Sequence, residues 1–345
     1  MRAHRVSDIA EQSGLSSATV DRVLHGGPGA SPRAVRAVEQ AVAELDRQAR
    51  SVRLGARSLV VDVVMQAPAR FSDAVRTAVE SQLRAVGPTA VRARFDLRES
   101  GDVADLLAAL DRVGRRGRTS DGVVLKAPSD PAVGRAVDDL AARGIPTVTL
   151  VTDVESSRVA YVGLDNWAAG RTAAHLVALG TRPAKGVVLA SVSRSAFTGE
   201  GERLQAFVAG LREDAPSLEV ITAAEADGLD RPTREAVATA LRGLRSPVRA
   251  VYSAGGGNRA ILAALAYAGE HPATFVAHDL DENNLEPLRT GAIDLVLHHD
   301  LRADARAALR QLLRHHRLVP GAPTSVPAGV QVVTRHNVPG RLGPR

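Results

Sequence analysis

Apolar and polar positions follow two different periods along the 345-residue chain. Residues 1–57 show helical spacing without a convincing strand, and the β-branched run Ser58–Met65 comes directly after them. From there, short apolar runs typical of buried strands alternate with longer amphipathic stretches typical of helices. This alternation predicts parallel sheet covered by helices on both faces.

The apolar runs predict strands at Ser58–Met65, Thr89–Phe95, Asp121–Ala127, Pro146–Val151, Val159–Gly163, Gly186–Ser191, Leu218–Thr222, Val248–Ser253, Ala273–His278 and Ala292–His298. Helices are expected between them, among others at Phe71–Val86, Asn166–Leu179, Arg231–Leu244 and Ala303–His315. A single open sheet of about ten strands is close to the size at which sheets split. We therefore expect an α/β core of two doubly wound parallel-sheet lobes with a ligand cleft between them.

The amino-terminal segment predicts a separate all-α helix-turn-helix headpiece. A first helix ends at Gly14, Ser16 is placed to cap a second helix, and Ser31-Pro32 opens a third. The apolar faces would be formed by Val6, Ile9, Ala10, Val20, Val23, Leu24, Val35, Val38, Val42 and Leu45. Three short helices with a short turn between the first two describe a DNA-binding helix-turn-helix, and a generic three-helix cap is the alternative.

Composition narrows the classes of function. The net charge of +6 is carried almost wholly by Arg, since only Lys126 and Lys185 are lysines, and Arg suits contacts with phosphate and guanine. Cys is absent, which excludes disulfides and thiolate metal sites. The sequence lacks a run of about 18 apolar residues and an export signal at its start, so we expect a cytoplasmic protein without a membrane partner.

Several motifs resemble the lactose-repressor family of bacterial transcriptional regulators. In the headpiece they are Asp8-Ile9-Ala10, Gly14-Leu15-Ser16 and Ala18–Leu24; in the core they are Val162–Asn166, Ala169-Gly170, Ala173–Leu176, Arg203 with Phe207, and Asp279. The resemblance covers essentially the whole chain and implies a periplasmic-binding-protein-like core. It implies a DNA-binding headpiece at 1–46, a hinge at 47–57, an effector-binding and dimerisation core at 58–334 and a flexible tail at 335–345.

The resemblance also implies which side chains contact DNA. Ser16, Ser17, Ala18 and Arg22 would face the major groove, where Arg22 can donate two hydrogen bonds to guanine. Ser16, Thr19 and Ser31 would hold phosphates, although Ser16 is equally suited to a helix cap. In the hinge, Val52 would enter the minor groove between Arg50 and Arg53, which would lie on phosphates. The sequence departs from the family at Asp21, where serine is usual, and in a shortened linker, which could be a solvated connector only.

Ligands of open α/β sheets bind beyond the carboxyl ends of the strands, so polar residues after the predicted strands are candidates. They are Arg70, Phe71, Lys126, Asp130, Asp153, Asp165, Asn166, Ser193, Arg203, Gly257, Asn258, Asp279, His299 and Asp300. Carboxylates and amides bind vicinal hydroxyls and Phe71 could cover a sugar ring, which predicts a sugar or polyol effector. The cluster Gly255–Asn258 keeps sugar phosphates open. Alternatives are a helix cap for Asp165, a surface ion pair with Glu200 for Arg203, a plain turn for Asp279 and a buried core role for His299.

Catalysis and metal binding have little support. Neither a Gly-x-Ser-x-Gly elbow nor a His-Glu-x-x-His helix is present, and adjacent histidines at 298–299 and 315–316 cannot readily chelate one ion. We expect a protein that is not an enzyme and binds neither a cofactor nor a metal. It would be a homodimeric repressor that binds a palindromic double-stranded DNA operator and is released by a small polar effector. The alternative is a sugar-binding protein or carbohydrate-processing enzyme of the same core fold without operator binding.

Overall fold

The computed structural model describes residues 4–339 except 14, 28–29, 33, 40, 43–58, 84, 87–89, 100, 116, 118, 182–184, 194–197, 227 and 326. The chain forms two compact units, one of Met1–Leu59 with Gly87–Arg92 and one of Val60–Val86 with Ala93–Arg345. The predicted hinge residues Arg50, Val52 and Arg53 lie outside the described residues, so their roles remain predictions. None of the described helices is long and apolar enough to cross a membrane.

The amino-terminal unit contains two short helices, α1 (Val6–Ser13) and α2 (Ser17–Leu24), and a further helical segment at 34–39 and 41–42. Ser16 caps α2, because its side chain accepts a hydrogen bond of 3.2 Å from the Thr19 amide. A small apolar core is shared by the helices and consists of Ile9, Ala10, Val20, Val38 and Ala41. The predicted apolar positions of the first two helices thus form this core, together with part of the third segment.

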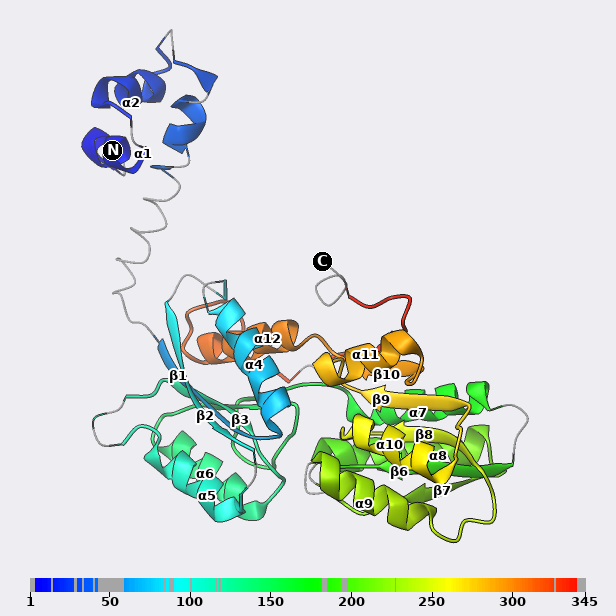
Figure 1. Cartoon of the computed structure of the whole chain (residues 1–345). Helices are drawn as coiled ribbons and strands as arrows, with labels where there is room; N and C mark the ends of the chain where they lie inside the picture. The colour runs from blue at the N-terminus through cyan, green and yellow to red at the C-terminus, as the bar shows by residue number, and fades with distance from the viewer. Residues whose placement is uncertain are drawn as a thin grey trace. The chain divides into compact units, whose positions relative to one another are not determined.

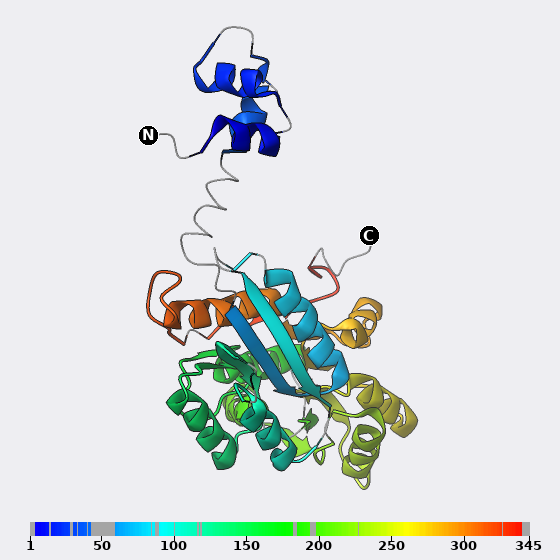
Figure 2. The same ribbon diagram turned by 90° about the vertical axis from the view of Figure 1, so that its left-hand side faces the viewer.

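The first sheet of the core has the strand order β2-β1-β3-β4-β5. Its strands are β1 (Leu59–Gln66), β2 (Val91–Arg98), β3 (Gly122–Lys126), β4 (Thr147–Leu150) and β5 (Ala160–Val162), and the pairs β1–β3, β3–β4 and β4–β5 are parallel. Its helices are α4 (Ala69–Gln82), α5 (Val103–Arg112), α6 (Pro131–Ala142) and α12 (Leu301–His315). Figure 1 shows α4 and α12 on one face of the sheet and α5 and α6 on the other. Figure 2 shows α4 again beside β1 and β2.

The second sheet has the order β11-β10-β9-β8-β6-β7. Its strands are β6 (Gly186–Ser191), β7 (Leu218–Thr222), β8 (Val248–Ser253), β9 (Thr274–His278), β10 (Leu295–His298) and β11 (Gln331–Val333). Its helices are α7 (Asn166–Gly180), α8 (Thr198–Asp214), α9 (Asp230–Leu241), α10 (Asn258–Ala268) and α11 (Glu282–Thr290). All of its pairs are parallel except β10–β11, which is antiparallel.

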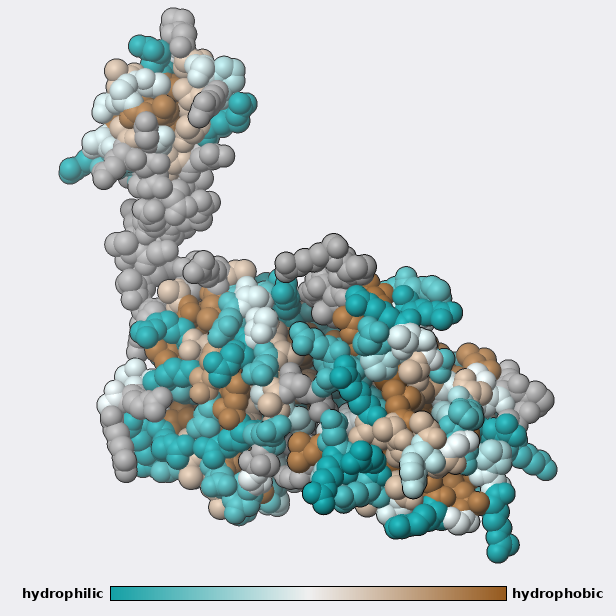
Figure 3. Space-filling model, viewed as in Figure 1, coloured by the Kyte–Doolittle hydropathy of each residue, from teal (hydrophilic) through white to brown (hydrophobic). Residues whose placement is uncertain are grey.

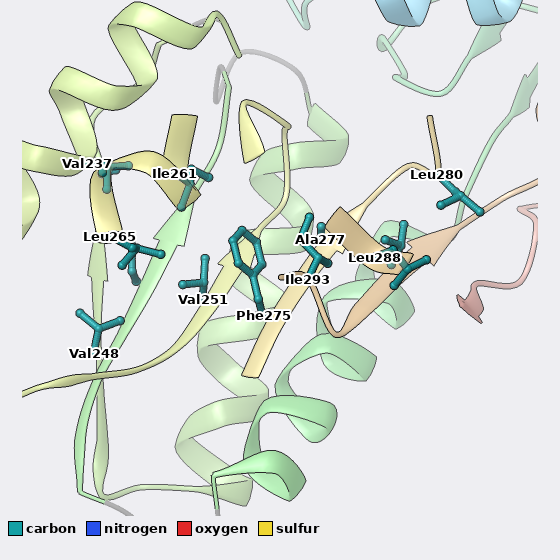
Figure 4. Packing of buried hydrophobic residues seen from close by; sticks show 14 of the residues in the cluster. Val237, Val248, Val251, Ile261, Leu265, Phe275, Ala277, Leu280, Leu288 and Ile293 are labelled. Carbon is teal, nitrogen blue, oxygen red and sulfur yellow. The ribbon is translucent and has the colours of Figure 1, made fainter. Parts of the chain in front are cut away.

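Both faces of the second sheet are buried, as the apolar strands predict. Successive residues of β9 enter different clusters: Phe275 and Ala277 pack with α9 and α10, whereas Val276 packs with α7 and α8. Figure 4 shows Phe275 between Val251 on one side and Ile293 on the other. On the face seen in Figure 3, hydrophilic side chains cover much of the core, with apolar residues scattered among them.

The chain passes between the sheets at three described connections. It leaves β5 for α7, leaves β10 for α12, and returns after α12 to β11. The first and third connections are bonded to each other, since Ala328 donates its amide to the Gly163 carbonyl at 2.7 Å and accepts from the Asp165 amide at 3.1 Å. The two predicted lobes and their parallel strands are confirmed. The short antiparallel strand β11 was not predicted, because its three residues do not form an apolar run.

Candidate functional site

A polar pocket lies where the carboxyl ends of strands from the two sheets meet. Its empty volume is about 920 Å³, part of which is open solvent. The first sheet and its connections contribute Ala67, Pro68, Phe71, Lys126, Val151 and Thr152; the second contributes Ser193, Gly199, Glu200, Arg203, Asp230, Gly255, Gly256, Gly257, Asn258, Arg259, His278, Asp279, Asp281, Asn283 and Asn284. The position agrees with the rule that ligands of open α/β sheets bind beyond the strand ends.

Arg203 is a buried cation of the pocket, with 3% of its surface exposed. Its Nε donates to Asn166 Oδ1 at 2.9 Å and its Nη1 to the Ala254 carbonyl at 3.1 Å. Gly170 allows this approach of α7 and α8, because a Cβ there would lie 2.3 Å from the Arg203 carbonyl oxygen. The guanidinium is therefore held rigidly before any ligand arrives, and the alternative of a surface ion pair with Glu200 is wrong.

Behind Arg203, the hydrogen bonds continue into the first sheet. Asn166 Nδ2 donates to the Tyr161 hydroxyl at 3.4 Å, and that hydroxyl lies 3.0 Å from the Leu164 carbonyl oxygen and 3.2 Å from that of Val151. Val151 lines the pocket with a φ of 68°, a strained conformation for a β-branched residue. The anchor of the pocket cation thus reaches the connection between β5 and α7.

Asp279 is a half-buried carboxylate of the pocket, directly after β9 of the second sheet. Its φ of 62° is held by Asn284, whose Nδ2 donates to the backbone carbonyls of His278 and Asp279 at 2.9 and 2.7 Å. Its Oδ1 lies 3.3 Å from His299 Nε2. Burial would raise the pKa of Asp279, but the neighbouring His299 and the charge of Arg203 together lower it below its ordinary value. The pocket therefore presents an ionised acceptor, and Asp279 is more than a plain turn residue.

Glu200 is a second carboxyl in the pocket. It accepts hydrogen bonds from the Ser193 amide at 2.7 Å and from the Ser193 hydroxyl at 2.6 Å. Burial raises the pKa of Glu200, and the bonds from Ser193 and the charge of Lys126 oppose part of that rise. A Cβ at Gly255 would lie 2.2 Å from Glu200 Oε2, so the glycine is required for this approach. The glycine-rich loop thus adjoins a carboxyl group, which disfavours a phosphate there.

Phe71 supplies the aromatic face of the pocket. The Lys126 ammonium lies 5.6 Å from the centre of its ring, within the range of a cation–π contact. Lys126 is the last residue of β3 in the first sheet, and Phe71 lies in α4, one of the helices that cover this sheet. This side of the pocket combines an apolar surface with a donor, whereas the side of Asp279 and Glu200 offers acceptors.

Buried amides and a neutral histidine complete the wall. Asn258 Nδ2 donates to Asn284 Oδ1 at 2.7 Å, and His278 Nε2 lies 3.0 Å from the Tyr252 hydroxyl. Burial, together with the charge of Arg203, lowers the pKa of His278 well below its ordinary value, so the ring is neutral. Asn258 Oδ1 and His278 Nδ1 have no hydrogen-bond partner among the described residues. They remain available to a ligand or to water.

The structure places the predicted effector residues in different surroundings. Phe71, Lys126, Ser193, Arg203, Gly257, Asn258 and Asp279 line the pocket. Asn166 and His299 are buried behind it, where they hold Arg203 and Asp279, so the alternative of a buried, hydrogen-bonded His299 is confirmed. The remaining carboxylates were misplaced: Asp130, Asp165 and Asp300 cap α6, α7 and α12, and Asp153 pairs with Arg158. Arg70 lies in α4, and its side chain is outside the described residues.

Glu200, His278 and Asn284 were missed as pocket residues. Selecting residues directly after strands overlooks side chains of the strand itself, such as His278, and those within the following helix, such as Glu200 and Asn284. Their polar character inside otherwise apolar or helical stretches was the available signal.

The candidate DNA-contacting residues lie together in the amino-terminal unit. Ser16, Ser17, Ala18, Arg22 and Ser31 are exposed and Thr19 is half-buried. The Ser31 hydroxyl accepts from the Ala34 amide at 3.2 Å, so Ser16 and Ser31 both serve as caps. Asp21, the departure from the family pattern, has its carboxylate 3.2 Å from His25 Nδ1.

Comparisons with known proteins concern the core. With the glucose-galactose binding protein of Geobacillus stearothermophilus, the chain shares 16% identity at a TM-score of 0.72 over 82% of this chain and 99% of that one. With a solute-binding protein of Burkholderia graminis in complex with D-arabinose, the chain shares 20% identity at a TM-score of 0.72, over 82% of this chain and 97% of that one. With a solute-binding protein of Agrobacterium vitis bound with α-D-tagatopyranose, the identity is 17% and the TM-score 0.69, over 82% of this chain and 96% of that one. These likenesses show the fold.

No curated protein matches the chain. Residues 62–317 match a family model described as the periplasmic binding protein domain. The match begins after the amino-terminal helices, so the resemblance to the lactose-repressor family stays a prediction. Through these residues, most of its length, the chain belongs to the periplasmic binding protein domain family.

Proposed function

We propose that the pocket binds a small polyhydroxyl ligand, a sugar or polyol. The support is the combination of an ionised acceptor at Asp279, a fixed donor at Arg203 and the aromatic face of Phe71. Donors and acceptors set around an apolar face suit a sugar ring, and the similar proteins named above bind sugars. A sugar phosphate is disfavoured by Glu200 beside the glycine-rich loop.

We further propose that the chain is a ligand-responsive DNA-binding regulator, in which the amino-terminal helices bind an operator. The observation that carries this proposal is the capped helix α2, which begins four residues after the end of α1 and exposes Ser17, Ala18 and Arg22. A second helix of this kind is the element that enters the major groove in helix-turn-helix proteins. The resemblance of these residues to the lactose-repressor family adds support.

The regulator would act in the cytoplasm as a homodimer. Two headpieces must read half-sites about 34–36 Å apart, so that the operator is a palindrome. Ligand binding would change the arrangement of the two sheets and thereby the affinity for DNA. A coupling of about 1–3 kcal/mol suffices for a change of about 5- to 150-fold. Release by the ligand, as in a repressor, is the direction we expect.

The test is selection of duplexes from a random pool by the purified chain at about 150 mM salt, followed by anisotropy on the enriched duplex. We expect an inverted repeat, and Arg22→Ala should weaken its binding by about 1–3 kcal/mol. Arg36→Ala removes another exposed Arg of the same unit and serves as the control. Binding that ignores sequence, or that Arg22→Ala leaves unchanged, would contradict the regulator.

The second candidate is a sugar-binding protein without operator binding, and the comparisons favour it over DNA-binding regulation. Two of the similar structures are sugar-bound solute-binding proteins of ABC transporters, and a third is a glucose-galactose binding protein, which argues against a carbohydrate-processing enzyme. A fourth is the fructose-binding periplasmic domain of a hybrid two-component system rather than of a transporter. Calorimetric titration with a panel of sugars, beside the DNA selection, separates the two candidates. Sugar binding without an enriched operator would support the second.

A further inference from the structure

His299 lies between two carboxylates at the connection from β10 to α12. Its Nε2 is 3.3 Å from Asp279 Oδ1, and its Nδ1 is hydrogen-bonded to Asp304 Oδ2. The side chain of His299 is 1% exposed and that of Asp304 is 6% exposed, whereas that of Asp279 is 30% exposed toward the pocket. One ring thus joins a pocket residue to a residue buried behind the pocket.

The two carboxylates require a cation between them. Two carboxylates that face each other across a neutral ring would be left without compensation, whereas an imidazolium is hydrogen-bonded to Asp304 and pairs by charge with Asp279. Burial alone would lower the pKa of His299, but Asp279 and Asp304 together raise it to about 9. The neighbouring His278 is neutral, and Arg203 also acts on Asp279, so His299 supplies the cation in direct contact with it.

The partners of His299 belong to opposite sides of the cleft. Asp279 follows β9 of the second sheet, and its backbone is fixed there by Asn284. Asp304 lies in the first turn of α12, which packs against α4, β4 and β5 of the first sheet. Phe71, the aromatic residue of the pocket, lies on α4. The same ion-pair network therefore joins the acceptor for the ligand to the helix layer that carries Phe71.

We propose that His299 is a positioning residue of the pocket, whose imidazolium fixes the Asp279 carboxylate against Asp304 of α12 so that ligand hydroxyls meet a pre-oriented acceptor. This inference rests on the proposed binding of a polyhydroxyl ligand. His299 does not line the pocket itself, so it acts on the ligand only through Asp279. Loss of the ring would let the carboxylate turn away from the ligand or take up a proton, and either change weakens the acceptor.

The test is calorimetric titration of the full chain with a panel of aldopentoses, aldohexoses and their alditols. The variants are His299→Gln, Asp304→Asn and the double variant, and circular dichroism verifies that each is folded. We expect His299→Gln to weaken the affinity for the sugar that the wild type binds by about tenfold or more. Asp304→Asn should weaken it in the same direction, although Asp304 lies away from the pocket lining. The double variant should be no weaker than His299→Gln, because both act through one contact.

The matched control is His175→Gln. It removes another histidine–aspartate pair, His175 with Asp214 at 3.1 Å, which is exposed on α7 and α8, and it should leave the affinity unchanged. If His299→Gln leaves the affinity unchanged, the positioning role is overturned. It is also overturned if the losses of the two single variants add in the double variant, as losses from a general structural effect would. Either result leaves the proposed sugar binding intact. A wild type that binds none of the sugars contradicts the proposed function and this inference together. If His299→Gln does not fold, Asp304→Asn carries the same test.

Discussion

The candidate DNA contacts and the candidate ligand contacts are held in opposite ways. In the amino-terminal unit they are exposed side chains, and their hydrogen bonds are local, as between Ser16 and the Thr19 amide three residues later. In the core they are mostly buried, and Arg203 bonds to Asn166 and Ala254, which are 37 and 51 residues away. A change in the first region should therefore have a small and local effect, whereas one in the second should disturb binding and stability together.

The largest effect is expected for Arg203→Met. It removes the donors to Asn166 and to the Ala254 carbonyl and the charge that compensates Glu200 and Asp279. We expect a loss of about 3–5 kcal/mol in the free energy of unfolding, measured by urea denaturation, and loss of sugar binding. Arg212→Met, an exposed position on the same helix, is the control. Equal stabilities of the two variants would contradict the anchored pocket.

The second expected effect is a dependence of core stability on pH. The pKa of His299 is about 9 in the folded protein and ordinarily 6.5, so its contribution is complete below about pH 6.5 and is lost as the pH rises through 9. A shift of this size corresponds to about 3 kcal/mol. Urea unfolding between pH 6 and 9.5 should show the decline in the wild type and a flatter profile in His299→Gln. Parallel profiles would mean that His299 is not the cation.

The same contrast between local and distant bonds decides how much could be predicted from sequence. The strands and both lobes follow from apolar runs, and the cap at Ser16 follows from a pattern of a few residues. Arg203 was found because it belongs to a motif, and Asp279 because it belongs to a motif and directly follows a strand. Asp130 and Asp165, which cap helices instead of lining the pocket, show the limit of prediction from sequence. A carboxylate after a strand can accept hydrogen bonds either from a ligand or from the amides of the next helix, and the sequence pattern is the same in both cases.

Distant partners leave no sequence pattern at all. That His299 forms an ion pair with Asp279 and a hydrogen bond with Asp304 depends on how β9, β10 and α12 meet in space, which the spacing of residues along the chain does not encode. The roles of Asn166 and Glu200 behind and within the pocket likewise depend on the approach of α7 to α8 and of Gly255 to Glu200. Sequence patterns therefore identified the region of the pocket better than the role of each residue in it.

A smaller effect tests how far the pocket network extends. Tyr161→Phe removes the hydroxyl that joins Asn166 to the carbonyls of Leu164 and Val151. Since these groups are buried, we expect a loss of about 1–2 kcal/mol in the free energy of unfolding. Tyr267→Phe removes the same group from a tyrosine that is 94% exposed and should change nothing measurable. If both variants are equally stable, the network ends at Asn166.

The smallest effect belongs to the amino-terminal unit. Ser16→Ala removes the cap of α2 and should cost about 1 kcal/mol there, which would raise hydrogen exchange at the Thr19 amide about fivefold in the full chain. Ser17→Ala changes an exposed hydroxyl one position inside α2, away from the cap, and is the matched control. Exchange in the strands of the core should be the same in both variants. A change of exchange in the core would show that the bonds of the headpiece are not local, and would remove the contrast between the two regions.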